Sequence, residues 1–425
     1  MKTKITVSTI AVLCVMSSMP AFSQSQINPS DAAEKAAEKT KTPAPKGYAA
    51  GDFILKPSLT VNEEYNDNIY TEDNNEVGDF VTHIIPKLTA ELKGYAHQLK
   101  IAAGLEQVIY ADETQNHYLN YDATISDRYN FDKTSYWAGS VGYRKRHSLP
   151  GDDDANPGAD AGEPLPYNMY DASTRLSKDF GNVELTPRAS FRRYEFDSVR
   201  RVNGTNIDQG GRDRDHYNVG GRANVPFNKD STVFVDLDWA PINYLQETAA
   251  ERDSNGGNYL AGLRWSPDKT ISVEAGLGLL TRNYDTAAYN DIDTLGATVS
   301  IAYAPMPGSK LAFDYDRSII EVTDAGVGGA VRDNVKASFS KDLTDLWTGR
   351  LNARYARTDY DGGLGATGGT RDRKDEYFSL GAGASYALTE TVAFTADYTY
   401  GNNDSNRNTA DYDQNVFLLG VKAGF

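Results

Sequence analysis

Apolar and polar residues alternate with a period of two from Phe53 almost to the last residue of the chain. In one representative segment, Phe394, Ala396, Tyr398 and Tyr400 are separated from one another by single polar residues. This period is typical of a β-strand with one apolar and one polar face, because successive side chains point to opposite sides. We count about eighteen such segments, each of roughly ten residues or more, and predict an all-β chain.

The apolar faces of so many strands need a cover. A soluble sandwich or propeller would provide it with a second layer, yet no helix or spare set of strands is visible in the sequence. A membrane provides it directly, and closure of the sheet leaves no unpaired edge. The predicted fold is therefore a single transmembrane, antiparallel, up-and-down β-barrel over residues 53–425. A mean hydropathy of −0.55 agrees with this, because only alternate residues would face lipid.

The connections between the predicted strands alternate between short and long, which is the pattern of outer-membrane barrels. The short ones are residues 93–95, 132–133, 180–182, 228–230, 266–268, 305–309, 342–345 and 389–390. The long, polar ones are residues 71–78, 150–164, 200–214, 248–256, 286–290, 324–329, 362–373 and 402–409. We expect the short turns and both termini on the periplasmic side. Trp137, Trp265 and Trp347 fall beside short turns and Trp239 beside a long loop, as two aromatic girdles require.

The last nine residues favour a barrel that closes on itself. One face of this segment would carry Phe417, Leu419, Val421, Ala423 and Phe425. A soluble sheet rarely ends on such a strand, because its free edge is a template for aggregation. The ending also resembles the C-terminal assembly signal of bacterial outer-membrane proteins, with Gly420, Ala423 and Phe425 as its glycine and apolar positions. We therefore expect recognition by the barrel-assembly machinery, although Leu418 stands where a polar residue is usual.

The N-terminus has the features of an export signal. Lys2 and Lys4 precede a short apolar stretch at residues 5–16, and a small-x-small cleavage site follows, so we predict a signal peptide at residues 1–23. A membrane anchor is the alternative, but the apolar stretch is too short to cross a bilayer. The only cysteine of the chain, Cys14, lies within this signal, so the exported chain would have neither a disulfide nor a cysteine-ligated metal.

Residues 24–52 form a polar segment before the first predicted strand. Their low apolar content predicts a short, disordered periplasmic tail. The alternative interpretation is a docking arm for a periplasmic or inner-membrane partner.

The net charge of −16 excludes some classes of partner. Nucleic acids and anionic lipids both attract basic surfaces, so neither is expected as the main partner. Lipid of the outer membrane is the expected surrounding of the apolar face.

Charged residues of the predicted strands fall on the polar face, which we expect to line the lumen. Arg or Lys facing lipid at mid-bilayer would cost about 2–4 kcal/mol, and so wide a barrel leaves a water-filled interior. The predicted basic residues of the lumen are Arg128, Arg144, Arg175, Arg188, Arg192, Arg222, Arg264, Arg282, Arg350 and Arg354, with Lys87, Lys100, Lys310, Lys336 and Lys422. The predicted acidic ones are Glu91, Glu106, Asp122, Asp171, Glu184, Asp236, Asp238, Glu274, Asp314, Asp316 and Asp397. These side chains would either form a translocation path or pair across neighbouring strands and stiffen the wall.

Neither catalysis nor a cofactor is indicated. The five histidines, His83, His97, His117, His147 and His216, are scattered, and no two of them have the spacing of a metal site. His117, His147 and His216 lie near strand ends, where some barrel enzymes keep their catalytic groups, but no nucleophile motif accompanies them. We expect no enzymatic activity and no cofactor.

The third long loop contains a weak calcium motif. Asp152, Asp154, Asn156 and Glu163 occupy positions 1, 3, 5 and 12 of a calcium-loop pattern. Position 6 is Pro157, where the pattern needs a glycine, and proline does not adopt the positive φ required there. A solvated acidic loop is therefore the alternative.

The start of the predicted barrel carries a distinctive motif. Residues 65–70 read Tyr-Asn-Asp-Asn-Ile-Tyr, and Asp79-Phe80 and an x-Pro at Pro86 follow in the next strand. This opening resembles the putative β-barrel porin 2 family, with the rest of residues 53–425 matching in pattern. The resemblance implies a wide outer-membrane barrel and, more loosely, a part in the export of exopolysaccharide or capsule. It defines no functional residues.

These observations lead to an ordered set of functional hypotheses. The first is an outer-membrane channel that translocates a hydrophilic polymer, an exopolysaccharide or capsular polysaccharide, with periplasmic and inner-membrane export components as partners. The second is a general or small-solute porin, favoured by the acidic third loop. The third is a non-transporting adhesin or envelope anchor with a plugged lumen.

Overall fold

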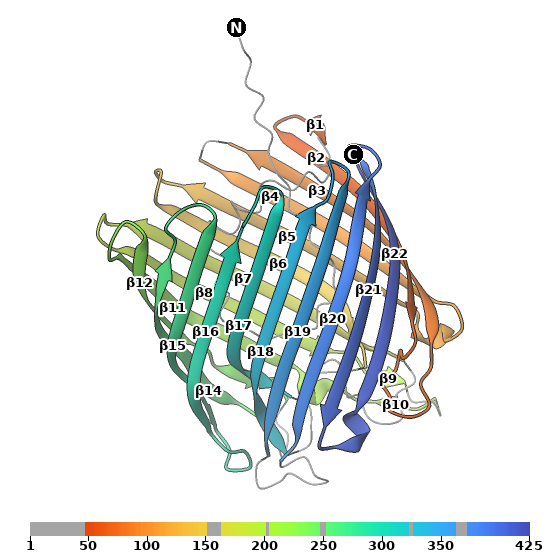
Figure 1. The fold of residues 1–425 in the computed structure, drawn as a ribbon. Coiled ribbons are helices and arrows are strands. Elements are labelled where there is room, and N and C mark those ends of the chain that lie inside the picture. The colour runs from red at the N-terminus through yellow and green to blue at the C-terminus, as the bar shows by residue number, and fades with distance from the viewer. Residues whose placement is uncertain are drawn as a thin grey trace.

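The structure, a computed structural model, describes residues 47–94, 96–150, 163–200, 204–246, 252–322, 326–362 and 372–425. It is a closed, 18-stranded antiparallel barrel, as the alternation predicted (Figure 1). The barrel strands are β2 (Phe53–Asn66), β3 (Asp79–Lys93), β4 (Gln98–Tyr110), β5 (Tyr118–Asn130), β6 (Tyr136–Ser148), β7 (Leu165–Asp179), β8 (Glu184–Phe196), β11 (Arg214–Pro226), β12 (Ser231–Trp239), β14 (Ser254–Trp265), β15 (Ile271–Tyr284), β16 (Ile292–Tyr303), β17 (Ser309–Glu321), β18 (Val327–Asp342), β19 (Trp347–Gly362), β20 (Lys374–Ala387), β21 (Val392–Ser405) and β22 (Tyr412–Gly424).

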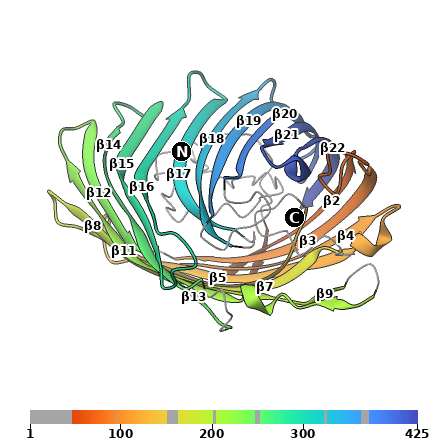
Figure 2. The same ribbon diagram turned by 90° about the horizontal axis from the view of Figure 1, so that it is seen from below.

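Each barrel strand pairs with its neighbours in the chain, and the first and last strands complete the ring. The closing ladder of β2 and β22 runs from Ser58↔Gly424 to Asn66↔Val416. Seen along the barrel in Figure 2, β3 to β11 form one long side of the ring and β14 to β20 form the opposite side. Every backbone edge within the sheet is therefore paired, as a membrane-spanning sheet requires.

The shorter elements lie at the ends of the barrel. They are β1 (Tyr48–Ala50), β9 (Val199–Arg200), β10 (Asn206–Ile207), β13 (Ile242–Tyr244) and the 3₁₀ turns η2 (Thr114–Asn116), η3 (Gly210–Arg212) and η4 (Asn408–Ala410). The last part of the predicted tail thus forms a hairpin with β2, in which Tyr48 pairs with Leu55. The boundaries predicted at residues 23 and 52 otherwise stay predictions, because residues 1–46 lie outside the described part of the chain.

One barrel position is filled by two strands in succession. Both β12 and β13 pair with β11, and Pro241 separates them. Proline has no N–H to give to a ladder, so the strand is interrupted where it occurs. The chain still follows the same path, because Tyr217 N donates to Pro241 O at 3.0 Å.

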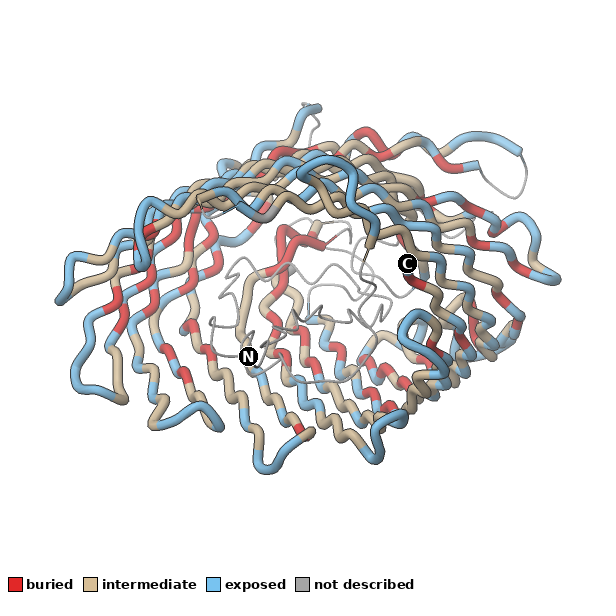
Figure 3. The backbone as a smooth tube through the Cα atoms, turned by 90° about the horizontal axis from the view of Figure 1, so that it is seen from above, coloured by how far each residue is buried: buried red, intermediate tan, exposed pale blue. Residues whose placement is uncertain are grey.

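Exposure alternates along the strands and identifies the two faces of the wall. In β12, Val235 and Leu237 are 43% and 49% exposed, whereas Asp236 and Asp238 are 6% and 2% exposed. Apolar side chains thus point outwards and charged ones inwards. Figure 3 shows how burial changes along the strands. The outward side chains include Trp137, Trp239, Trp265 and Trp347. The described residues contain no helix whose length and hydropathy would let it cross a membrane.

The inward face is not polar along its whole length. Near the ends that carry the long loops, inward apolar side chains form small buried clusters. One contains Ile69, Val81, Val108, Tyr110 and Tyr118, and a second contains Leu165, Tyr194, Phe196 and Val199. These clusters give the loops an apolar base to pack on. Where a strand end carries apolar side chains on its inward face as well as its outward face, a loop folds over that end.

Candidate functional site: the charged inner wall

The exposure pattern places the predicted lumen residues on the inward side of their strands. Their role in transport stays a prediction, but the structure shows which of them meet. It brings Arg144, Arg188, Arg222, Arg264 and Arg350 together with carboxylates from nearby strands, a relation that the sequence could not define because the register was unknown.

An extended ion-pair network crosses β8, β11, β12, β14 and β15. Its members are Arg188, Arg222, Arg264, Asp236, Asp238 and Glu274. Arg222 donates to both oxygens of Glu274, each at 2.9 Å, and Arg264 Nε donates to Glu274 Oε2 at 2.7 Å. Arg188 donates to Asp236 and Asp238. Bidentate bonds between charged groups are strong and directional, so the network fixes this part of the wall.

The local sequence makes this network possible in two ways. Gly220 lies between Arg188 and Asp238 in the ladder, and a Cβ on it would come within 2.1 Å of Asp238 Oδ1. A side chain at this position would therefore block the contact between β8 and β12. Below the network, the Arg222 guanidinium stacks on the inward ring of Phe234 at 3.8 Å from its centroid. Sequence reasoning missed Phe234, because an inward aromatic breaks the alternation.

A second group of polar contacts lies further around the ring, over β17 to β21. Arg350 donates to Asp397 Oδ1 at 2.8 Å. Arg354 Nε donates to Asn334 Oδ1 at 3.0 Å, and Asn334 Nδ2 donates to Asp316 Oδ1 at 2.9 Å. The amide of Asn334 thus links a cation and an anion that are two strands apart.

A third group lies on β2 to β7 and includes residues that the sequence analysis did not select. Lys56 pairs with Glu91 at 2.7 Å, and Arg146 pairs with Asp122 at 3.1 Å. Both Lys56 and Arg146 share the inward parity of their strands, so strict use of the alternation would have found them. Glu106 accepts from Asn120 at 2.9 Å.

Three predicted arginines have a different environment. Arg128 and Arg175 approach the Tyr136 ring, with 3.6 and 5.6 Å from Cζ to the centroid, and no described carboxylate forms an ion pair with either. Arg282 is buried and donates to the Ala240 carbonyl at 2.8 Å. Arg282 therefore supports the interrupted strand at β12 and β13, while Arg128 and Arg175 leave positive charge on the wall.

Some charged residues outside the predicted lumen set face outwards. Arg193 Nε and Nη2 each donate to Asp215 at 2.7 Å on the outer face, and Tyr315 Oη donates to Asp333 at 2.7 Å. These pairs lie towards the strand ends that carry the long loops. The strands therefore extend past the apolar belt, where charge no longer meets hydrocarbon.

The family-type motif of β2 joins the two ends of the barrel sheet. Asn68 is fully buried, and its Nδ2 donates to the carbonyls of Glu72 and Asp413, both at 2.8 Å. Asp67 accepts from the backbone N and the Nδ2 of Asn415 at 2.6 and 2.7 Å. These contacts bind the loop after β2 to the start of β22, so the motif has a structural role at the closing seam.

Asp79, the acidic residue of the second motif, is also a structural anchor. It is 2% exposed, and its carboxylate accepts backbone N–H groups from Ala111, Asp112 and Glu113 at 2.8 to 3.3 Å. A carboxylate that receives several N–H donors holds a loop in place. Asp79 thus fixes the connection after β4 over the start of β3.

The structure gives no support for a metal centre. Within the described ranges, no three His, Cys, Asp or Glu side chains are placed to share an ion. Asp152, Asp154 and Asn156 of the predicted calcium loop lie outside the described residues. Glu163 is described, and its Oε1 accepts from Arg200 N at 2.8 Å, so this carboxylate ties the third loop to β9.

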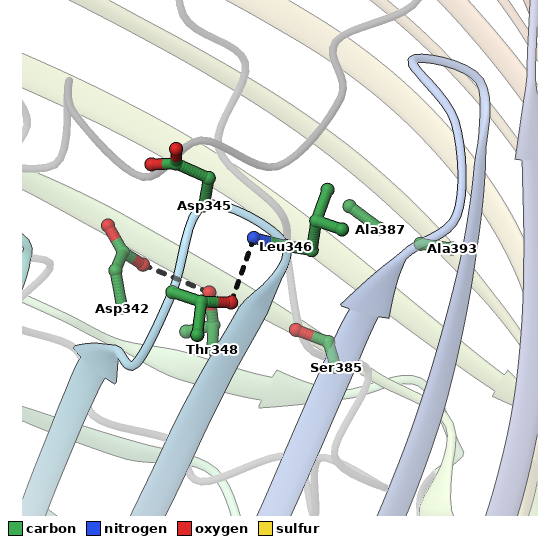
Figure 4. Close-up of a pocket in the computed structure, with 8 residues that line it drawn as sticks. Asp342, Asp345, Leu346, Thr348, Ser385, Ala387 and Ala393 are labelled. Carbon is green, nitrogen blue, oxygen red and sulfur yellow. Dashed lines mark hydrogen bonds between the residues drawn. The ribbon is translucent and has the colours of Figure 1, made fainter.

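A small hollow lies between the turns that follow β18 and β20 (Figure 4). Thr348 Oγ1 donates to Asp342 Oδ1 at 2.9 Å beside it, and Ser385, Ala387 and Ala393 complete the lining. Its volume of about 10 Å³ corresponds to one water molecule, which excludes it as a substrate site. The inner wall is the better candidate.

The model of the family described as putative beta-barrel porin 2 matches residues 42–425. The chain belongs to this family. It is therefore an outer-membrane β-barrel of the porin type, and it lies in the outer membrane. This is a family of channels; the absence of enzymatic activity stays a prediction.

Several solved outer-membrane proteins have a similar outline. OccK1 (OpdK) of Pseudomonas aeruginosa is 12% identical over 87% of this chain and 99% of its own, with a TM-score of 0.46. OprD of the same organism is 11% identical over 90% and 97%, with a TM-score of 0.45. The siderophore receptor PirA of Acinetobacter baumannii is 8% identical over 87% and 80%, with a TM-score of 0.46. No curated protein matches the chain.

Proposed function

We propose that this barrel translocates a hydrophilic polymer across the outer membrane, and that the polymer is an exopolysaccharide or capsular polysaccharide. The observation that supports this most is that arginines and carboxylates of the inner wall form ion pairs with each other. Arg222 and Arg264 share Glu274, and Arg350 meets Asp397 further around the ring. A wall of matched charges has a weak net field and many hydrogen-bonding groups, which suits a hydroxyl-rich solute better than one kind of ion.

A polymer also needs weak, repeated binding. A solute that binds too tightly at one site does not leave the channel, so conduction requires several moderate sites. The three groups of polar contacts lie on different strands around the ring, on β8 to β15, β17 to β21 and β2 to β7. Each offers carboxylate, guanidinium and amide groups to sugar hydroxyls. This arrangement supports the stepwise passage of a saccharide chain.

The partners belong to the same proposal. The barrel-assembly machinery would recognise Gly420, Ala423 and Phe425 on the last strand. Periplasmic and inner-membrane export components would deliver the polymer to the end of the barrel with the short turns. In Figure 1, β1 and the C-terminus lie at that end.

The test begins with a strain that lacks this gene and a complemented control. The proposal predicts loss of polysaccharide from the cell surface and its accumulation in the periplasm. Unchanged surface polysaccharide together with reduced uptake of small sugars would favour the small-solute porin. Purified barrel that gives no conductance in a planar bilayer would contradict both transport functions and favour the adhesin or envelope anchor.

A further inference from the structure

A continuous row of small polar side chains crosses the inner wall from β5 to β11. In the ladder, the residues of this row are Ser126↔Ser140↔Ser173↔Ser190↔Asn218, one from each of five adjacent strands. Ser140 and Ser173 lie within 2.8 Å of each other at their Oγ atoms. Neighbouring strands are about 4.8 Å apart, so the row extends over roughly 19 Å. We call it the serine row.

The serine row is accessible from the lumen. Trp137, Val141, Leu176 and Val219 are exposed on the opposite parity of the same strands and face outwards. The residues of the row therefore face inwards; Ser173 and Ser190 are exposed, and Ser126, Ser140 and Asn218 are half-buried. An accessible row of hydroxyl groups without large side chains between them provides a track for a ligand rather than a packed wall.

Arginines border the serine row on both sides. On the side of the short turns, Arg128 and Arg175 lie one ladder step away, with Tyr136 beside them. On the other side lie Arg192 and the Arg144–Asp171 pair. Each of these side chains has a planar face or fork that sugars and carboxylates use in recognition.

The charge around the serine row is not balanced, unlike that of the network on β8 to β15. Among the described residues, no ion pair is formed by Arg128, Arg175 or Arg192, and the buried Nε of Arg192 has no hydrogen-bond partner. Arg128 Nε donates only to the neutral Asn130 amide at 3.0 Å. Arg192 faces Asp171, which already pairs with Arg144, whereas Arg128 and Arg175 approach the same Tyr136 ring and pair with no described carboxylate. An anionic ligand beside Arg128 and Arg175 would reduce the repulsion between them.

We infer that the serine row binds an acidic saccharide chain, in which sugar carboxylates meet the arginines and sugar hydroxyls meet the serines. This inference rests on the proposed function and makes its substrate class specific: a polysaccharide that contains uronate residues. The length of the row favours a chain over a single small anion, because one carboxylate would contact only one or two of its side chains. Tyr136 would add a flat surface for a sugar ring.

The experiment uses the purified, folded full chain in a planar bilayer. Block of the ion current is measured with oligogalacturonate, with a malto-oligosaccharide of the same length, and with monomeric galacturonate. The inference predicts that oligogalacturonate blocks at concentrations at least tenfold lower than either of the other two. Equal block by the neutral and the acidic oligosaccharide, in a barrel that conducts, would overturn the uronate assignment and leave the polymer channel standing.

Variants then test whether the serine row is the site. The double variant Arg128→Gln/Arg175→Gln is expected to weaken block by oligogalacturonate roughly threefold to tenfold, the range for two solvated ionic contacts. Ser140→Ala/Ser173→Ala keeps every charge and is expected to weaken it roughly threefold. Arg357→Gln removes the same charge from the outer surface and serves as the control. An unchanged block in both double variants would place the uronate contact elsewhere and overturn the inference.

A barrel that does not conduct at all gives a separate answer. It would contradict the proposed channel function itself, and binding of oligogalacturonate to the protein in detergent would then be measured by calorimetry. Binding that is lost in Arg128→Gln/Arg175→Gln would keep the serine row as a saccharide site on a non-transporting barrel. The absence of any binding would overturn the inference as well.

Discussion

Asn68 is a single residue on which the closure of the barrel depends. Its buried side-chain amide contacts the loop after β2 and the backbone of Asp413, and its backbone carbonyl accepts from Gln414 Nε2 at 2.8 Å. We expect Asn68→Ala to lower the free energy of unfolding by about 2–3 kcal/mol, because backbone groups in a buried site lose their partners. Urea unfolding in lipid vesicles measures this. Asn74→Ala in the same exposed loop is the control, with an expected change below about 0.5 kcal/mol.

Asp132 gives a prediction for the pH dependence of a single turn. Backbone N–H groups of Thr134 and Ser135 donate to its carboxylate at 2.9 and 2.7 Å and lower the pKa of Asp132. Because the pKa of Asp132 is lower in the folded state, its ionised carboxylate stabilises the folded barrel. This stabilisation is complete above the pKa of an aspartate in the unfolded chain, about 4, and is lost as the pH falls below it. Asp132→Asn should therefore destabilise the barrel at pH 7 and have little effect at the acid limit. Lys133→Gln, which keeps these bonds, should show neither effect.

At the scale of elements, Glu274 on β15 neutralises arginines from two other strands. Replacing it with Gln leaves Arg222 on β11 and Arg264 on β14 without this carboxylate. The permeability ratio of chloride to potassium should rise roughly twofold to fivefold, because the two arginines of the wall then keep their positive charge without this carboxylate. Reversal potentials across a salt gradient measure this ratio. Glu76→Gln, in an exposed loop, is the control, and an equal shift in both variants would contradict a role for the wall network.

The same elements show how far the sequence could lead. The period of two defined the faces of β12 and β15 and hence the strand count, because a strand that spans the membrane leaves no other arrangement of apolar residues. The alternation could not predict that Arg222 meets Glu274, because this contact depends on the register of three ladders and on Gly220. It also missed the inward Phe234 and the outward Arg193, because packing under the loops and the length of the strands beyond the membrane leave no periodic signal.

At the scale of the whole molecule, the ring predicts a contact between strands from opposite ends of the chain. Val61 and Val421 are directly paired across β2 and β22. Because the only native cysteine lies at position 14, Val61→Cys/Val421→Cys gives a clean background for a disulfide. We expect oxidation to link the two strands in the folded barrel, detected by gel mobility, because directly paired residues are close enough for the bond. Val61→Cys/Phe417→Cys, displaced along the ladder, should not cross-link, and equal yields would contradict the register.

The seam between β2 and β22 also has a consequence for the order in which the barrel is made. Asp67 and Asn415 are bonded although they lie 348 residues apart in the chain, whereas most other barrel ladders connect strands that follow one another. A local hairpin costs little chain entropy to close, but this contact requires the longest loop in the molecule. The wall can therefore zip together one hairpin at a time, while the ring remains an open sheet until its last step. An assembly factor that holds the two free edges near each other would accelerate that step above all others.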